Sequence, residues 1–467
     1  MKDKVIINEK DNVGVSLTGF GEIPAGHKFA LKDIKKGEYV IKYGEIIGKA
    51  TADIQKDEWV HTHNVKSHLD EKFEYVYKPV LPNIEQKNAS FMGYKRKNGR
   101  AGIRNDIYII PTVGCVNNVC KKLESLSQKY VSGSIDGIFA LTHQFGCSQL
   151  GQDNENIKKV LCCIALNPNA SFVLFVGLGC ENNGLDGIKN YLKPFGRDNI
   201  AYFNCQDVED EIEYGLNIIK SFAEKASGLK REKVSMNELC IGLKCGGSDG
   251  YSGLTANPLV GIISDNVVAA GGSAVLTEVP EMFGAEQILM NKCKNREVFE
   301  KYKKMIEDFK DYYLSQGFPV YENPSPGNKK GGITTLEEKS LGCVEKAGST
   351  MIVDVLDYGE IVKEQGVSAL NAPGNDLIAA TALAASGCQI VLFTTGRGTP
   401  FSSFVPTMKI ASNDRLSEFK SNWIDFNAFN MDADSLYNLI IKTVNGDYKC
   451  KSEDMREIAF YKTGVTL

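Results

Sequence analysis

The sequence predicts a multidomain protein, in which a small all-β N-terminal domain is followed by two α/β domains with largely parallel sheets. Three observations predict this class. Short apolar segments separated by turn residues fill residues 1–85. From Gly93 onward, apolar strands alternate with helical segments, which is typical of parallel α/β sheets. A charged segment, residues 225–238, divides this α/β part into two.

The all-β prediction depends on four short segments without a long helical pattern between them. These are DNVGVSL (11–17), HKFALKDI (27–34), EYVIKYGEIIG (38–48) and EWVHTHNV (58–65). Glycines and a proline punctuate them, as expected of turns between strands. The stretch YKPVLPNIEQKNAS that follows is polar and contains proline, so we expect domain 1–85 to be followed by a linker at 86–92.

The second domain, residues 93–230, contains three strands that each end in a turn. DIYIIPTVGC, GIFALTHQFGC and SFVLFVGLGC are these segments, and helical patterns follow the first two. The C-terminal domain, residues 231–467, repeats this logic in ELCIGLKCGGSDG, AVLTEVPEMFGAE, STMIVDVLD and CQIVLFTTGRGTP. Parallel sheets bind ligands beyond the carboxyl ends of their strands, so we expect functional residues in these turns.

Composition excludes several classes of protein. The 467 residues carry a formal net charge of −4, which gives no basic footprint for nucleic acid. We find no uncharged apolar run of about 18 residues and no apolar leader segment, so we expect no membrane partner and a cytoplasmic location. The thirteen cysteines are spread over the chain and are expected to be mostly reduced.

Three cysteines have the same unusual placement. Cys115, Cys147 and Cys180 each follow a glycine at the end of an apolar strand. A small residue that fits a tight turn explains any one of them, but the repetition in one domain favours a shared site. No CxxC pair is present, which argues against a zinc ribbon. Thiolates and imidazoles from separate strand ends suit iron or zinc better than magnesium.

The histidines offer further candidates. His61 and His63 stand two apart in a predicted strand, so they are expected to share one face and to form a preorganised metal pair. The alternative is two half-exposed strand residues. His143 lies four residues before Cys147 and is a candidate ligand or acid/base, although a lone histidine is more often structural.

Charged residues near the turns complete the inventory. Arg100 and Arg104 in GRAGIRN fit a loop around an anionic group, and a solvated basic face is the alternative. Glu278, which follows a strand, is a candidate acid or base. Further candidates for substrate binding are Lys244, Asp249 and Arg397. The glycine-rich segments match neither a Walker loop nor GxGxxG, so nucleotide binding is weakly supported.

These stretches together resemble the altronate/galactarate dehydratase family. HKFALKDIKKGEYVIKYGEIIGKA and EWVHTHN are similar to the SAF domain of altronate dehydratases, so the first domain is expected to be SAF-like (a β-clip). The blocks GYKRKNGRAGIRNDIYIIPTVGCVN, HQFGCSQ, GLGCEN, LKCGGSDGYSGLTANP, LTEVPEMFGAE and APGNDLIAATALAASGCQIVLFTTGRGTPF follow in the family's order. The resemblance covers essentially the whole chain.

The resemblance implies an iron-dependent hydro-lyase of hexuronate catabolism. The HTHN element favours the altronate branch, so the expected reaction is D-altronate to 2-keto-3-deoxy-D-gluconate plus water, by metal-assisted β-elimination without nicotinamide. A galactarate or other aldonate dehydratase, or a sulfo-lyase, is the alternative within the family. A non-catalytic protein that binds sugar acids or regulates is the alternative of another class.

Expectations for the site follow from this reading. We expect His61 and His63 to join Cys115, Cys147 and Cys180 at an iron site. Either one Fe²⁺ takes the imidazoles and one or two thiolates, or the three thiolates hold an iron–sulfur cluster and the histidines act as acid and base. Both versions need neutral histidines, so activity should fall in mild acid.

Two further expectations concern binding. Arg100 or Arg104 is expected to hold the substrate carboxylate. The only partner expected is the small sugar-acid substrate, with a homodimer as one assembly considered.

Overall fold

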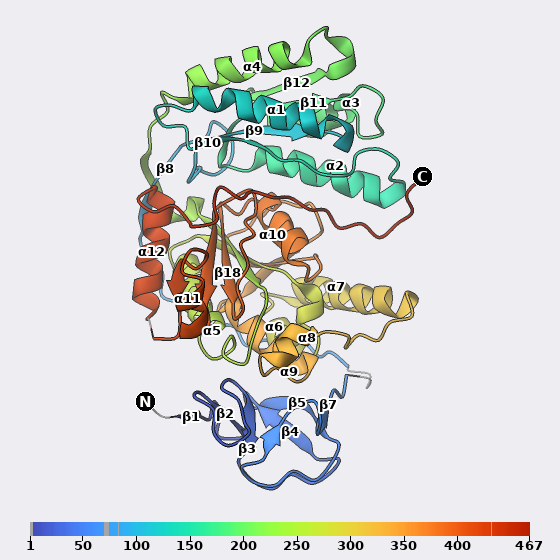
Figure 1. Ribbon diagram of the computed structural model, residues 1–467, viewed down its shortest axis with the longest axis vertical. Coiled ribbons are helices and arrows are strands. Elements are labelled where there is room, and N and C mark those ends of the chain that lie inside the picture. The colour runs from blue at the N-terminus through green and yellow to red at the C-terminus, as the bar shows by residue number, and fades with distance from the viewer. Residues whose placement is uncertain (1–2, 70–73, 83, 431) are drawn as a thin grey trace.

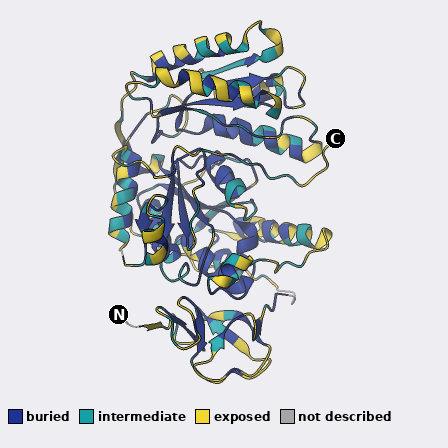
Figure 2. Cartoon of the chain, in the orientation of Figure 1, coloured by how far each residue is buried: buried dark blue, intermediate teal, exposed yellow. Residues whose placement is uncertain are grey.

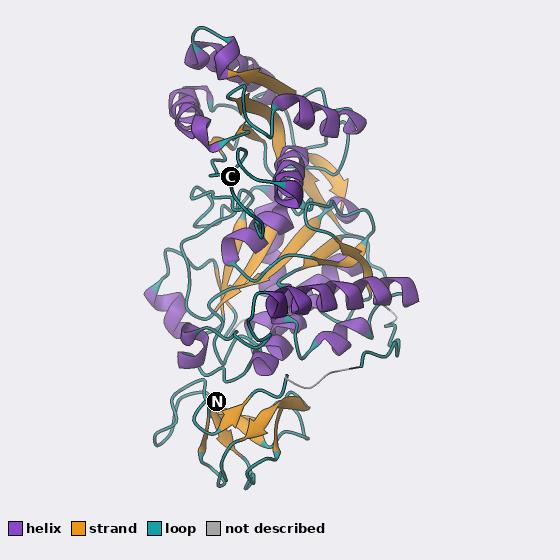
Figure 3. Ribbon diagram, turned by 90° about the vertical axis from the view of Figure 1, so that its right-hand side faces the viewer, coloured by secondary structure: helices purple, strands orange, loops and turns teal. Residues whose placement is uncertain are grey.

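The computed structural model describes residues 3–69, 74–82, 84–430 and 432–467. Figure 1 shows three bodies stacked along the long axis, and Figure 3 shows the same order from the side. The β module lies at one end, the C-terminal α/β domain in the middle and the second domain at the other end. The predicted class, one small antiparallel β domain and two domains with parallel sheets, is confirmed.

The β module consists of two small antiparallel sheets, ordered β1–β2–β3–β6 and β4–β5–β7. Its strands are β1 (Lys4–Val5), β2 (Val13–Ser16), β3 (Lys28–Ala30), β4 (Tyr39–Lys42), β5 (Glu45–Ala50), β6 (Trp59–Val60) and β7 (Val65–Lys66). The segment EWVHTHNV is therefore not one strand. Residues 61–64 form a turn, because the side chain of Asn64 accepts a hydrogen bond from the amide of His61 (2.9 Å) and competes with strand pairing.

Residues 74–82 lie against the C-terminal domain. The hydroxyl of Tyr75 donates to Glu286 (2.6 Å), and the amide of Val80 donates to the carbonyl of Asn291 (2.7 Å). Residues 90–92, expected to be linker, belong to strand β8 (Ser90–Gly93), which pairs antiparallel with β13 (Glu232–Ser235). The chain enters the second domain through β8 and returns to the C-terminal domain through β13, so this two-stranded ribbon contains both connections between the two domains.

The second domain has a four-stranded parallel sheet in the order β10–β9–β11–β12. Its strands are β9 (Asp106–Pro111), β10 (Gly137–Ala140), β11 (Ala170–Gly177) and β12 (Ile200–Asn204). Its helices are α1 (Asn117–Ser127), α2 (Gly151–Leu166), α3 (Leu185–Leu192) and α4 (Glu211–Ala226). Because α1 and α4 cover one face and α2 and α3 the other, the strands are buried and read as continuous apolar runs.

The C-terminal domain has a seven-stranded parallel sheet in the order β16–β17–β15–β14–β18–β19–β20. Its strands are β14 (Cys240–Cys245), β15 (Ser273–Leu276), β16 (Ile352–Leu356), β17 (Gly366–Leu370), β18 (Ile390–Thr395), β19 (Thr407–Ala411) and β20 (Phe426–Asn427). Its helices are α5 (Ala256–Ala269), α6 (Glu286–Met290), α7 (Arg296–Ser315), α8 (Pro326–Lys330), α9 (Leu336–Val344), α10 (Asp376–Ala385), α11 (Asp414–Phe419) and α12 (Ala433–Asn445). The central strands are buried, whereas the outer faces of α7 and α12 are exposed (Figure 2).

The last described residues return to the second domain. Thr466 forms a β-bridge with Gln149, and the ring of Phe460 packs edge-on against His143 with centroids 5.1 Å apart. Buried ion pairs also join the two domains, since Arg104 contacts Glu453. No helix of the described chain combines the length and apolarity needed to cross a membrane.

Candidate active site

The carboxyl edge of the seven-stranded sheet gathers oppositely charged groups from three neighbouring strands. Lys244 lies near the end of β14, Glu278 follows β15, and Asp376 begins α10 beyond β17. The ammonium of Lys244 donates to the carboxylates of both Glu278 and Asp376, the latter at 2.8 Å, and to the carbonyl of Cys245. Its three donors are thereby used, so Lys244 holds the two acids in place. The side chain of Asp376 is 36% exposed and forms the outer end of this group.

Glu278 has a strained backbone and an unusual environment. Its φ of 72° and ψ of 53° place it in the left-handed region, which costs a residue other than glycine about 1 kcal/mol or more. Strain of this kind concentrates at functional sites. Burial, reinforced by the neighbouring Cys245 thiolate, raises the pKa of Glu278 to about 8 despite the contacts to Lys244 and Lys346. Glu278 is therefore the best-placed acid/base candidate at this edge.

Two thiols and a carboxylate form a triangle beside this group. The sulfurs of Cys245 and Cys343 lie 3.2 Å apart, and the Oε2 atom of Glu281 lies 3.5 Å and 3.3 Å from them. A hydrogen bond from Cys343 lowers the pKa of Cys245 to about 5. Burial opposes ionisation of Glu281, but the ammonium of Lys339 (2.8 Å) outweighs it and lowers the pKa of Glu281 to about 2.

Asp249 and Arg397, both expected to bind substrate, lie on the loops after β14 and β18. The carboxylate of Asp249 is buried and accepts from the side chains of Ser252 (2.9 Å), Ser412 (2.8 Å) and Asn413 (2.9 Å), in addition to two backbone amides. These contacts saturate it, so Asp249 ties loops together rather than binding substrate. Arg397 is exposed and contacts only the carbonyl of Gly327 (3.4 Å) among the described residues, which leaves donors free.

The β module docks beside this edge, against α8 and α9 (Figure 1). The ammonium groups of Lys28 and Lys42 each donate to one oxygen of Glu338 at 2.8 Å, and all three side chains are buried. The ring of His61 is also buried here, with its Nδ1 atom 3.2 Å from the hydroxyl of Thr334. Burial, with the charge of Lys28 as a second cause, lowers the pKa of His61 to about 4.

The predicted five-residue iron site does not form within one chain. His61 and His63 belong to the β module, whereas Cys115, Cys147 and Cys180 are exposed on the second domain, beyond the intervening C-terminal domain. His63 is exposed in the turn, although both imidazoles contact the ring of Trp59 with centroids 5.5 and 5.3 Å away. The loss of activity expected in mild acid does not follow for His61, because its pKa lies well below that range.

The predicted arginine clamp is also wrong. Arg104 is buried and donates to both oxygens of Glu453 (2.6 and 3.0 Å) and to the carbonyls of Ile103, Thr443 and Tyr448. All five donors of its guanidinium are thus occupied. Arg100 contacts the carbonyls of Asn237 and Leu239 and the hydroxyl of Ser273, at the opposite, amino end of the sheet. Both arginines therefore join domains.

Comparison with known proteins agrees with the order of these domains. Family profiles match three consecutive stretches: the altronate/galactarate dehydratase SAF domain at residues 16–68, the D-galactarate dehydratase/altronate hydrolase second domain at 93–227, and the D-galactarate/altronate dehydratase C-terminal domain at 236–466. The altronate dehydratase of Bacillus subtilis (strain 168) is 48% identical over 100% of both chains. The chain belongs to the altronate/galactarate dehydratase family.

Two other family members are similar over most of their length. The altronate dehydratase of Escherichia coli (strain K12) is 45% identical over 99% of both chains. The galactarate dehydratase (L-threo-forming) of the same organism is 33% identical over 87% of this chain and 81% of its own. The family resemblance stated from the motifs is therefore confirmed.

Some groups at the edge of this dehydratase-family sheet had no signal in the sequence. Cys343 follows Gly342, but this pair lies near the end of helix α9 and not after an apolar strand, so it lacks the strand-end pattern of Cys115, Cys147 and Cys180; Lys339 and Lys346 read as ordinary surface charges. Asp376 did have a signal, because Asn375 accepts hydrogen bonds from the amides of Leu377 and Ile378 as a helix cap. The segment PGND (373–376) places this helix cap shortly after strand β17, and a helix that begins just after a strand begins at the carboxyl edge of the sheet.

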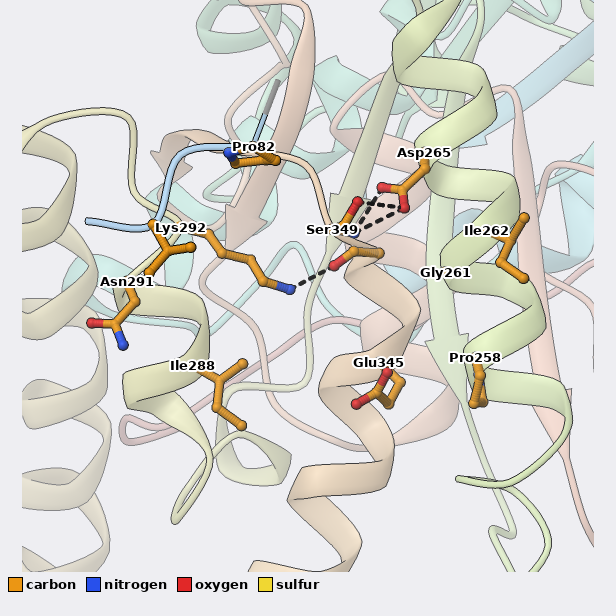
Figure 4. A pocket seen from close by; sticks show the side chains of 12 residues that line it. Pro82, Pro258, Gly261, Ile262, Asp265, Ile288, Asn291, Lys292, Glu345 and Ser349 are labelled. Carbon is orange, nitrogen blue, oxygen red and sulfur yellow. Dashed lines mark hydrogen bonds between the residues drawn. The ribbon is translucent and has the colours of Figure 1, made fainter. Parts of the chain in front are cut away.

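A separate hollow of about 650 Å³ lies on the outside of α5 and α6 (Figure 4). Apolar side chains, among them Ile262 and Ile288, line much of it. Two of its three charged residues are internally paired: Lys292 donates to the carbonyl of Gly348 (2.6 Å), and Asp265 accepts from the amide and hydroxyl of Ser349. Groups paired in this way are poor candidates for chemistry, so we place the active site at the carboxyl edge.

His143 is a structural residue rather than a ligand. Its Nε2 atom lies 2.8 Å from the carbonyl of Pro111, and its Nδ1 atom accepts from the amide of Phe145 (3.1 Å). Both ring nitrogens are thus committed, and burial lowers the pKa of His143 to about 4.

We therefore expect His143 to make folding sensitive to acid. Its pKa is lower in the folded chain than the value of 6.5 that applies without burial. The unfolded chain takes up the proton first, so stability is lost as pH falls from about 6.5 towards 4, by up to about 3 kcal/mol. The variant His143→Gln keeps a donor and an acceptor but cannot titrate. Urea unfolding at pH 7 and pH 5 should show a smaller loss in this variant, and equal losses would contradict the assignment.

Proposed function

We propose that this protein is a sugar-acid hydro-lyase that converts D-altronate to 2-keto-3-deoxy-D-gluconate and water. The observation that carries the proposal is the Lys244–Glu278–Asp376 group at the carboxyl edge, in a chain similar over its full length to two altronate dehydratases. Dehydration of a 2,3-dihydroxy acid needs a base for the C2 proton and a cation for the carboxylate. No electrons are gained or lost, so no nicotinamide is required.

The residues present divide these tasks. The Glu278 carboxylate takes the proton from C2, and Lys244 fixes its orientation through the hydrogen bond that also holds Asp376. Arg397 binds the substrate carboxylate, since a guanidinium with free donors matches that group and stabilises the enediolate that develops beside it. The proton that Glu278 takes from C2 passes to the departing C3 hydroxyl, which leaves as water, and the enol tautomerises to the 2-keto acid.

We propose iron as the cofactor, which when bound supplies Lewis-acid assistance to the departing hydroxide. The residues fit it in two places. Cys115, Cys147 and Cys180 lie on neighbouring loops, joined by the hydrogen bonds of Gly114 to Phe145 and of Asn183 to Gly146, and offer three thiols for the cluster version, but they lie on the second domain and not beside Glu278. The buried triangle of Cys245, Glu281 and Cys343 suits a single ion. Both sets rely on thiolates, which prefer iron or zinc.

The test is anaerobic purification followed by an assay of 2-keto-acid formation on a panel of D-altronate, galactarate, other aldonates and sulfolactate. We expect turnover with altronate and much weaker turnover with the others. Turnover of galactarate but not altronate would refute the substrate assignment. Tight binding of sugar acids without any turnover would instead support the non-catalytic alternative.

We also propose that the enzyme works in the cytoplasm as a homodimer. Its thirteen free cysteines suit a reducing compartment. Exposed apolar side chains around the hollow of Figure 4, including Ile262, Val80 and Leu81, favour burial against a second copy. Light scattering of the purified protein decides the assembly.

A further inference from the structure

Three potential metal ligands from three different elements meet beside the Lys244–Glu278 pair. Cys245 ends β14, Glu281 follows β15, and Cys343 belongs to α9. Their donor atoms form a triangle with edges of 3.2, 3.5 and 3.3 Å, and all three side chains are buried. Among the described residues, this is the one group of three such donors within mutual reach of a single ion.

We propose that Cys245, Glu281 and Cys343 bind one divalent transition-metal ion. The spacing supports this. Metal–sulfur distances of about 2.3 Å and metal–oxygen distances of about 2.0–2.2 Å place donors on a tetrahedral ion about 3.5–3.8 Å apart. The two sulfur–oxygen edges are shorter than this by about 0.1–0.3 Å and the sulfur–sulfur edge by about 0.5 Å, so side-chain rotation must move the sulfurs apart when the ion binds.

Charged side chains of both signs surround the triangle. Three acids, Glu278, Glu281 and Asp376, face three ammonium groups. These ammonium groups belong to Lys244, Lys339 and Lys346. The acids and ammonium groups thus pair with one another around the triangle. Because cysteine binds metal as a thiolate, an incoming divalent ion displaces any proton that the two sulfurs still carry.

The donor set indicates the class of metal. Two sulfurs and one carboxylate oxygen, buried away from water, prefer Fe²⁺, Zn²⁺ or Co²⁺ to Mg²⁺ or Ca²⁺. The ion would lie beside the proposed base. Binding itself does not depend on the proposed reaction, so the site can be tested by a spectroscopic signal that needs no turnover.

The test is an anaerobic titration of the metal-free full chain with Co²⁺. Binding is monitored through the thiolate-to-cobalt charge-transfer absorption. We expect one equivalent of Co²⁺ to produce this band, and the double variant Cys245→Ser/Cys343→Ser to lose it. A matched control is Cys240→Ser/Cys388→Ser, which removes another buried thiol pair (3.6 Å) and should keep the band. The triple variant Cys115→Ser/Cys147→Ser/Cys180→Ser should also keep it, which separates this site from the exposed cysteines.

If the double variant Cys245→Ser/Cys343→Ser does not fold, a second measurement tests the same site in the unaltered chain. In the unaltered chain, Co²⁺ should protect two thiols from alkylation during partial unfolding, and peptide mass spectrometry should identify them as Cys245 and Cys343. Absence of the band in the unaltered chain, or its persistence in the double variant, overturns the proposal. A chain that forms keto acid without binding Co²⁺ here would refute this site and leave the proposed function standing.

Discussion

Glu278→Gln is expected to lower kcat on D-altronate by about 10³-fold, with little change in KM. A positioned general base contributes about 10²–10⁴-fold, and glutamine has nearly the same shape but cannot accept the C2 proton. Arg397, which is proposed to bind the carboxylate, lies on another loop and is unaffected. The measurement is steady-state 2-keto-acid formation, with circular dichroism and thermal unfolding to establish that the variant is folded.

The matched control for this experiment is Glu453→Gln. Glu453 is also a buried glutamate in an ion pair, with Arg104, but it lies at the junction with the second domain. Its replacement should cost comparable stability and leave kcat nearly unchanged. If Glu278→Gln retained kcat within tenfold of the unaltered chain, Glu278 would be a structural partner of Lys244 and another group would be the base.

Glu338→Gln is expected to weaken the docking of the β module by about 3–5 kcal/mol. The substitution leaves the ammonium groups of Lys28 and Lys42 buried without a counter-charge, and removing one partner of a buried ion pair costs about this much. Hydrogen exchange of the β3 and β4 amides should rise strongly. Amides in β14 and β18 should stay protected, because the sheet of the C-terminal domain does not depend on this triad.

A triple variant provides the decisive comparison. Replacing the whole triad, Lys28→Met, Lys42→Met and Glu338→Leu, removes all three buried charges and keeps similar side-chain volume. Such replacements are often neutral or stabilising, so docking should recover. Unchanged protection in Glu338→Gln, or no recovery in the triple variant, would show that other contacts hold the module.

The sequence was sufficient to predict the fold class and the edge of the sheet at which chemistry gathers. Continuous apolar strands followed by glycine-rich turns identify parallel strands, and for these the carboxyl ends of neighbours must coincide. Lys244, Glu278 and Arg397 could therefore be placed at one edge without coordinates. Which pairs touch could not be predicted, because partners such as Asp376 come from residues more than a hundred positions away.

The errors have separate physical causes. The histidine pair was misplaced because Asn64 closes a turn through its own side chain, and alternation along a strand no longer applies. Arg104 resembled an anion clamp because its true partner, Glu453, lies 349 residues further on. Cys343 was missed because its Gly342-Cys343 pair lies inside a helix and not after an apolar strand, the position that distinguished the other candidate cysteines. Each error concerns a long-range or side-chain interaction that composition and periodicity do not encode.

Because residues 74–82 lie along the C-terminal domain, the β module needs less intrinsic affinity for its docking surface than a separate protein would. Since these residues are already bound there, the module begins a short span from its docking surface, and its binding is intramolecular. A short tether supplies an effective concentration of about 1 mM or more. An intrinsic dissociation constant of about 10 μM would then keep the module docked about 99% of the time. The contacts that dock the β module, the Lys28–Glu338–Lys42 triad among them, therefore need only modest intrinsic affinity to keep it in place.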